Sequence, residues 1–202
     1  MKPQDIFLLS KGHASPLFYA ILADKGLIDK KELWKFATKE GTLGVHLDNH
    51  IPGAIITAGS LGHGLGIGAG MALANRSRDV YVLLGDGECY EGSVWEAIMF
   101  AGERHLDNLI AIVDYNKLMV TRKVDLEPFA KKWEAFSWHA HIVHGHNFNY
   151  RATINDMPNV FIAHTVKGKG IDFMENQILW HGEAPKGEYI EKARECLLNK
   201  RT

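Results

Sequence analysis

The chain has little cysteine, little net charge and no long apolar run. Its two cysteines, Cys89 and Cys196, lie far apart without CxxC spacing, which is typical of free thiols in a reducing compartment. The formal net charge of -1 gives no bulk attraction to nucleic acid or to an anionic membrane, so any phosphate must bind at a local site. No run approaches the roughly 20 apolar residues of a membrane-spanning helix, and the N-terminus lacks a signal peptide. We therefore expect a cytoplasmic protein with no nucleic-acid or membrane partner.

The pattern of apolar residues indicates an α/β fold. With 202 residues, of which 46% are apolar, the chain can bury one sizeable core, and we expect a single domain over residues 1–202. Short, almost continuously apolar strands alternate with helices, which predicts an open, mostly parallel sheet with helices on both faces. The expected strands are 80–84, 109–115, 138–143 and 159–166, and the expected helices are 14–23, 30–37, 91–105, 126–136 and 188–199.

A glycine-rich helix is a further expectation. Six glycines fall between Gly59 and Gly70, although each glycine inside a helix costs about 1 kcal/mol relative to alanine. Gly62, Gly66 and Gly70 would share one face. We interpret that bare face as a place where another backbone or a ligand approaches, and we expect it to contact a neighbouring subunit.

Two polar residues follow neighbouring strands of the expected sheet. Asp86 stands in the sequence GDG directly after one strand, and Asn116 follows the next strand one helical crossover later. Ligands bind at the carboxyl ends of parallel strands, so both side chains should reach one crevice. The glycines leave amides open to a phosphate, and the Asp86 carboxylate, the Asn116 amide oxygen and the Leu118 carbonyl suit Mg²⁺. Alone, GDG is a weak signal, because Asp-Gly is a common turn and Asn often caps one.

Six ordered motifs strengthen this interpretation. They are FLLSKGHAS, GVHLDNHIPGAIITAGSLGHGLGIGAGMALA, GDGECYEGSVWEAIMFAG, VDYNKL, AHTVKGKG and WHGEAP, and they span residues 7–185. Together they resemble the N-terminal, thiamine-diphosphate-binding domain of the transketolase family. Other thiamine enzymes share a GDG and a downstream Asn, whereas the SKGH, LGHG and KGKG…WHG elements favour the transketolase branch.

The resemblance implies a set of site residues. The metal, Mg²⁺ or Ca²⁺ or Mn²⁺ in its place, would be held by Asp86, Asn116 and the Leu118 carbonyl. The catalytic histidines would be His13, His46 and His181, although Leu47 stands where the family has the proline of its HPE motif. Residues implied to bind thiamine diphosphate are His13, Gly59, Leu61, Gly85, Asp86, Gly87, Glu91, Asn116 and His181.

Several residues are open to a plainer interpretation. The chain has eleven histidines, and without the resemblance each is more simply a surface or hydrogen-bonded core residue. Lys167 and Lys169 could contact an anionic substrate or only flank a solvated turn. Cys89, although close to GDG, is interpreted as a packing residue, because the cofactor would carry the chemistry.

The resemblance also implies a partner. The chain has no counterpart of the family's pyrimidine-binding and C-terminal domains, or of the helical segment that precedes SKGH. We therefore expect the N-terminal subunit of a split transketolase-like enzyme, forming a homodimer within a heterotetramer with a C-terminal subunit that carries the pyrimidine-binding domain. The implied reaction is two-carbon ketol transfer between sugar phosphates. The alternatives are a deoxyxylulose-phosphate synthase-like or 2-oxo acid decarboxylating subunit, or a non-catalytic cofactor-binding module.

Overall fold

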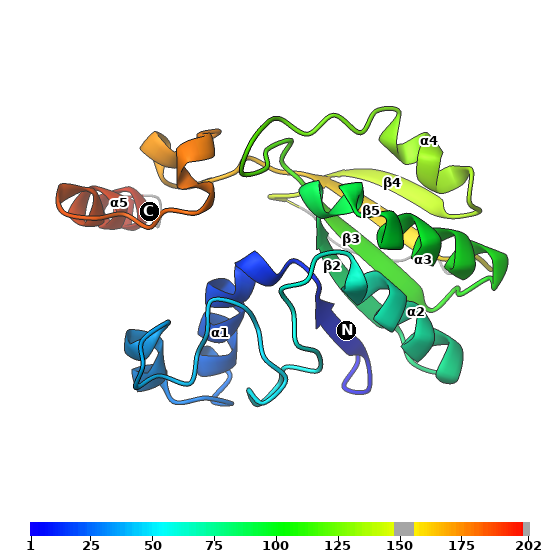
Figure 1. Ribbon diagram of the computed structural model, residues 1–202, viewed down its shortest axis with the longest axis horizontal. Helices are drawn as coiled ribbons and strands as arrows, with labels where there is room; N and C mark the ends of the chain where they lie inside the picture. The colour runs from blue at the N-terminus through cyan, green and yellow to red at the C-terminus, as the bar shows by residue number, and fades with distance from the viewer. Residues whose placement is uncertain (148–155, 200–202) are drawn as a thin grey trace.

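The described residues form one five-stranded sheet in which every strand is parallel to its neighbours. The computed structural model describes residues 1–147 and 156–199. The strands pair in the order β1-β2-β3-β5-β4 (Figure 1). Their bounds are Ile6–Leu9 for β1, Val80–Gly85 for β2, Leu109–Tyr115 for β3, His139–His144 for β4 and Asn159–His164 for β5.

The α-helices are short, and the one between β2 and β3 forms the expected crossover. Their bounds are Ser15–Asp24 for α1, His63–Ala74 for α2, Gly92–Glu103 for α3, Phe129–Glu134 for α4 and Glu188–Asn199 for α5. None of the helices described is both long and apolar enough to cross a membrane.

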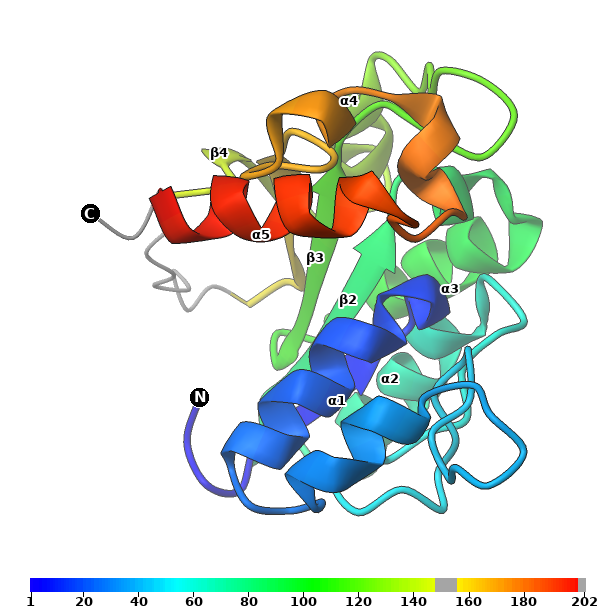
Figure 2. The same ribbon diagram turned by 90° about the vertical axis from the view of Figure 1, so that its left-hand side faces the viewer.

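Successive side chains of a strand point to opposite faces of the sheet, so the buried residues form clusters on both faces. Val80, Val82 and Leu84 of β2 join a large cluster with residues of α2, α3 and α4. Leu83, which points the opposite way, packs in a second cluster with residues of α1. In Figure 2, α1 and α5 lie in front of the sheet, while α2 and α3 lie behind it. This arrangement confirms the expected fold class, an open parallel sheet with helices on both faces.

The structure differs from the expected elements in two places. β1 was not expected, because its four apolar residues are too few to show a periodicity. The segment expected to be a helix over 30–37 is a 3-10 helix, Lys30–Lys35. The connection between β4 and β5 falls largely in 148–155, outside the described residues.

The glycine-rich segment becomes helical only at His63, and the helix glycines that pack against the sheet of this chain lie on another face than Gly62, Gly66 and Gly70. Gly62 is the N-cap, with φ of 85° in the left-handed region that favours glycine. Within the helix, the buried glycines are Gly64 and Gly68; a methyl group on Gly68 would lie 2.6 Å from Val82 Cγ2. Gly66 is exposed, and nothing lies within 4 Å of a methyl built on Gly70. The glycines therefore let α2 pack closely on β1 and β2 of its own chain.

Candidate active site

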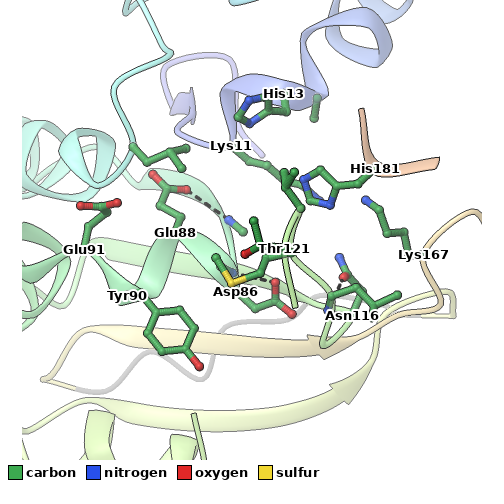
Figure 3. Close-up of a pocket in the computed structure, with 17 residues that line it drawn as sticks. Lys11, His13, Asp86, Glu88, Tyr90, Glu91, Asn116, Thr121, Lys167 and His181 are labelled. Atoms are coloured by element: carbon green, nitrogen blue, oxygen red, sulfur yellow. Dashed lines mark hydrogen bonds between the residues drawn. The ribbon is translucent and has the colours of Figure 1, made fainter. Parts of the chain in front are cut away.

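A cavity of about 360 Å³ lies at the carboxyl ends of the strands. It is bordered by the segments that follow β1, β2, β3 and β5, as parallel α/β sheets place their ligand sites. Figure 3 shows these segments converging on it. The sequence-predicted residues that line it are His13, Leu61, Gly85, Asp86, Gly87, Glu91, Asn116, Leu118 and His181. His46 and Gly59 do not line it.

Asp86 contributes a buried carboxylate to this cavity. Its side chain accepts hydrogen bonds from the amides of Gly87, at 2.7 Å, and Lys117, at 2.6 Å. In the described parts of the chain no cationic side chain forms a salt bridge with it. Burial raises the pKa of Asp86, and the two amide hydrogen bonds only partly oppose that shift. A buried carboxylate without a paired cation is costly, so this group is suited to a bound cation.

Asn116 and Leu118 bring further oxygen atoms to the same end of the sheet. β2 and β3 are adjacent, with Gly85 in register with Asp114, and this places Asp86 beside Asn116 as expected. The Asn116 carbonyl oxygen accepts a hydrogen bond from the Leu118 amide at 3.0 Å. Lys117 between them has φ of 62°, a left-handed conformation that turns the chain sharply.

The donor set of this site is one that suits a hard cation. The described residues contain no group of three or more His, Cys, Asp or Glu side chains that could hold a metal ion. Asp86, Asn116 and the Leu118 carbonyl instead offer one charged and two neutral oxygens at a common wall of the cavity. Oxygen donors of this kind fit Mg²⁺, which keeps further positions for phosphate oxygens and water. The predicted metal ligands therefore fit the group, and their role stays a prediction.

Two lysines make one side of the cavity cationic. Lys11 follows β1, Lys167 follows β5, and both line the cavity (Figure 3). Burial lowers the pKa of Lys167, and the nearby charge of Lys11 lowers it further. Lys11 pairs with Asp114. Sequence reasoning left Lys167 ambiguous and did not single out Lys11 or Asp114, because an ion pair between distant strands has no local signature.

The three predicted histidines gather above the carboxylate, although only two reach the cavity. The His13 ring centroid lies 5.0 Å from that of His46 and 6.3 Å from that of His181. His46 is exposed beside His13, and a methyl group on Gly59 would lie 3.3 Å from His46 Cγ. His13 and His181 therefore line the cavity, whereas His46 and Gly59 lie behind them beside His13.

Both cavity histidines are held neutral. Burial lowers the pKa of His181 to about 4, with a further contribution from the charge of Lys167. Burial also lowers the pKa of His13, followed by the effects of His46 and Lys11. The His181 Nδ1 atom is buried and has no hydrogen-bond partner among the residues described. Neutral imidazoles can both donate and accept a proton, which suits them to polarising or protonating a ligand oxygen.

The lowered histidine pKa predicts a loss of stability in acid. The unfolded chain takes up these protons near the ordinary pKa of 6.5, whereas folded His181 resists protonation until about pH 4. Unfolding thus binds protons between these values, so His181 should lower the free energy of unfolding as pH falls from about 6.5 to about 4. Urea titrations of wild type and His181→Gln without cofactor should diverge in this window, with wild type losing more stability. An NMR titration that put the His181 pKa at 6.5 or above would contradict the prediction.

A second buried carboxylate, not foreseen from the sequence, organises the wall opposite the lysines. Glu88 accepts hydrogen bonds from the Ser10 hydroxyl, from the Gly62 amide at 2.9 Å and from the Gly85 amide at 3.2 Å. It thereby joins the ends of β1 and β2 to the start of α2. Glu91, exposed at the N-cap of α3, borders the cavity beside it. Cys89 is fully buried and burial raises its pKa, as expected of a packing residue.

Fold and site together define a class of protein. An open parallel α/β sheet carries, at its strand ends, a glycine turn, oxygen donors for a hard cation, two lysines and two neutral histidines. This combination is suited to binding a diphosphate together with a divalent cation. The amides of Gly85 and Gly87, expected to be open, instead donate to the side chains of Glu88 and Asp86.

Comparison with known proteins gives the family. Residues 2–200 match the family described as "Transketolase, thiamine diphosphate binding domain". The chain belongs to the transketolase family, and it corresponds to the N-terminal part of these transferases. The fold class and the family resemblance stated from the sequence are therefore confirmed.

Relatives and solved structures agree with this assignment. The chain is 39% identical to an apulose-4-phosphate transketolase subunit of Actinobacillus succinogenes, covering 96% of this chain and 76% of that protein. It is 41% identical to transketolase of Homo sapiens, covering 89% of this chain but 31% of that protein. The crystal structure of Campylobacter jejuni transketolase superimposes with a TM-score of 0.85 at 29% identity, covering 96% of this chain and 35% of that chain. The chain thus spans most of the Actinobacillus protein and about a third of a full-length transketolase.

Proposed function

We propose that this chain is the diphosphate-binding subunit of a split transketolase, and that it binds thiamine diphosphate with Mg²⁺ in the cavity at the strand ends. The observation that carries the proposal is the buried, unpaired carboxylate of Asp86 beside the oxygens of Asn116 and Leu118. When bound, the cofactor supplies the electron sink for moving a two-carbon ketol unit between sugar phosphates.

The residues of this chain bind, orient and exchange protons. Asp86, Asn116 and the Leu118 carbonyl hold the cation, and Lys11 and Lys167 offset the remaining diphosphate charge. Gly85 and Gly87 keep the wall free of side chains, so that backbone can approach the phosphates. His13 and His181, both neutral, donate to or accept from oxygens of the reacting sugar.

A partner subunit completes the enzyme in this proposal. Two relatives support it because they are themselves named as subunits. One is the apulose-4-phosphate transketolase subunit described above. The other, "6-deoxy-6-sulfo-D-fructose transketolase subunit SqwG" of Clostridium sp., is 40% identical, covering 88% of this chain and 70% of that protein. The exposed side chains of Ile67 and Phe100 line a groove between α2 and α3 that also includes Gly62 and Ser93. Leu73 and Met99 are exposed on the same two helices. We propose that this surface contacts a neighbouring subunit in a cytoplasmic assembly of two such chains and two partners.

The proposed function predicts activity only in a reconstituted complex. The chain mixed with a subunit carrying a pyrimidine-binding domain, thiamine diphosphate and Mg²⁺ should transfer a ketol unit from a ketose phosphate to an aldose phosphate. The chain alone should show no transfer. Product analysis by mass spectrometry tests the reaction, and sedimentation of the mixture tests the stoichiometry.

Three outcomes would contradict parts of this proposal. Release of carbon dioxide from a 2-oxo acid, without ketol transfer, would favour the decarboxylating alternative. Cofactor binding without turnover beside any partner would favour a non-catalytic module. A monomer at micromolar concentration, alone and in the mixture, would overturn the proposed contact of α2 and α3.

A further inference from the structure

Asp114 belongs to the middle strand of the sheet and does not line the cavity. It lies near the end of β3, and its carboxylate is contacted by three side chains. Lys11 Nζ and Thr165 Oγ1 each donate a short hydrogen bond to it, and Asn116 Nδ2 lies 3.4 Å from Asp114 Oδ2. The partners come from the segments after β1, β5 and β3. One carboxylate at the end of β3 thus contacts side chains that follow β1, β3 and β5.

These contacts decide which way the Asn116 amide faces. Its nitrogen is directed at the Asp114 carboxylate, so its oxygen must point elsewhere. That oxygen accepts a hydrogen bond from the Leu118 amide at 3.0 Å. Both Asn116 and Leu118 line the cavity. A flipped amide would bring its oxygen against a carboxylate oxygen and its nitrogen against an N–H donor, and both contacts are repulsive. Asp114 therefore favours the orientation in which an oxygen is available to a cation.

The same carboxylate holds the Lys11 side chain. The Lys11 and Asp114 side chains are each 24% exposed, so their ion pair is partly shielded from water. Unlike a surface lysine, Lys11 is thereby held at the cavity wall, where Figure 3 shows it between His13 and His181. Because Asp114 Oδ1 is occupied by Thr165, both oxygens of the carboxylate have partners within the chain. Asp114 is therefore placed to orient other residues and not to bind the ligand.

We propose that Asp114 is a positioning residue that turns the Asn116 oxygen toward the metal and holds the Lys11 ammonium toward the diphosphate. This inference rests on the proposed function. Removing a residue that orients a metal ligand by a hydrogen bond typically weakens metal affinity by about 10–100-fold.

The test compares the affinity for Mn²⁺ with that for thiamine diphosphate. In Asp114→Asn, which keeps the shape but loses the charge, Mn²⁺ binding followed by electron paramagnetic resonance at saturating thiamine diphosphate should weaken by about 10–100-fold. Asp24→Asn, the same change on a side chain that is 84% exposed, is the matched control and should leave the affinities for Mn²⁺ and thiamine diphosphate within about threefold of wild type. Lys11→Met should weaken thiamine diphosphate binding at saturating Mn²⁺. Thr165→Val, which removes one support of the Asp114 carboxylate, should weaken Mn²⁺ binding by a smaller factor of the same sign.

The outcomes separate this inference from the function on which it rests. If wild type bound neither Mn²⁺ nor thiamine diphosphate, the proposed function itself would fail. If wild type bound both while Asp114→Asn and Thr165→Val bound Mn²⁺ as tightly as wild type, only the role of Asp114 would be overturned. Should Asp114→Asn not fold, Thr165→Val decides: weakened Mn²⁺ binding with an unchanged melting temperature supports the role, and unchanged binding refutes it.

Discussion

Replacing Asp86 by Asn should abolish metal-dependent thiamine diphosphate binding while leaving the folded chain at least as stable as wild type. The amide keeps an oxygen that can accept one backbone N–H, but it lacks the charge that attracts a divalent cation. We expect the dissociation constant for thiamine diphosphate with Mg²⁺ to rise by more than about 100-fold, beyond the range typical of residues that only orient the ligands. Isothermal titration calorimetry measures this change.

The stability effect has the opposite sign because of the burial of Asp86. The wild-type carboxylate is 2% exposed and burial raises its pKa, so the folded state holds an unfavourable charge when no cation is bound. Removing that charge relieves a desolvation cost. Asp24→Asn, the same change on a side chain that is 84% exposed, is the control and should alter neither quantity. A folded variant that bound the cofactor normally would show that Asp86 has no metal role.

Two glycines of α2 should respond to alanine in opposite directions. A methyl group on Gly64 would overlap the side chain of Ser10 and approach its backbone, so Gly64→Ala should destabilise the fold by about 1–3 kcal/mol, as overpacking does. Ser10 also donates to Glu88, so the displacement would reach the cavity wall. Gly70 has open space around it, and Gly70→Ala should stabilise the helix by about 0.5–1 kcal/mol.

Urea denaturation of the two variants gives this comparison directly. The pair controls for helix propensity, since both positions lie in the same helix and receive the same methyl group. Equal effects of the two substitutions would mean that α2 does not pack on the sheet through Gly64.

The pairing of Asp86 with Asn116 could be predicted because it follows from one regular rule. A strand, a helix and a second strand return the chain to the same sheet edge, so residues just past both strands become neighbours. Sequence spacing was sufficient for that inference. The same holds for β2, β3 and α3, whose apolar patterns are long enough to define them.

The parts that were missed depend on contacts between distant segments. Lys11 and Asp114 are separated by 103 positions, and Ser10 and Glu88 by 78, so no local pattern marks either pair. Helical spacing correctly grouped the glycines into faces but did not reveal which face meets the sheet. Gly64 and Gly68 pack there because β1 and β2 lie beneath them, and β1 itself was too short to recognise.

The order of the strands also determines how the cavity forms during folding. Its residues extend from Lys11 to His181 along the chain, and it requires β1 to pair with β2 although seventy residues separate the two strands. Contacts between such distant segments slow folding, because much chain entropy is lost before they form. The cavity is therefore complete only when β1, β2, β3 and β5 have taken their places in the sheet. A cofactor that binds there recognises only the finished domain and shifts the folding equilibrium toward it.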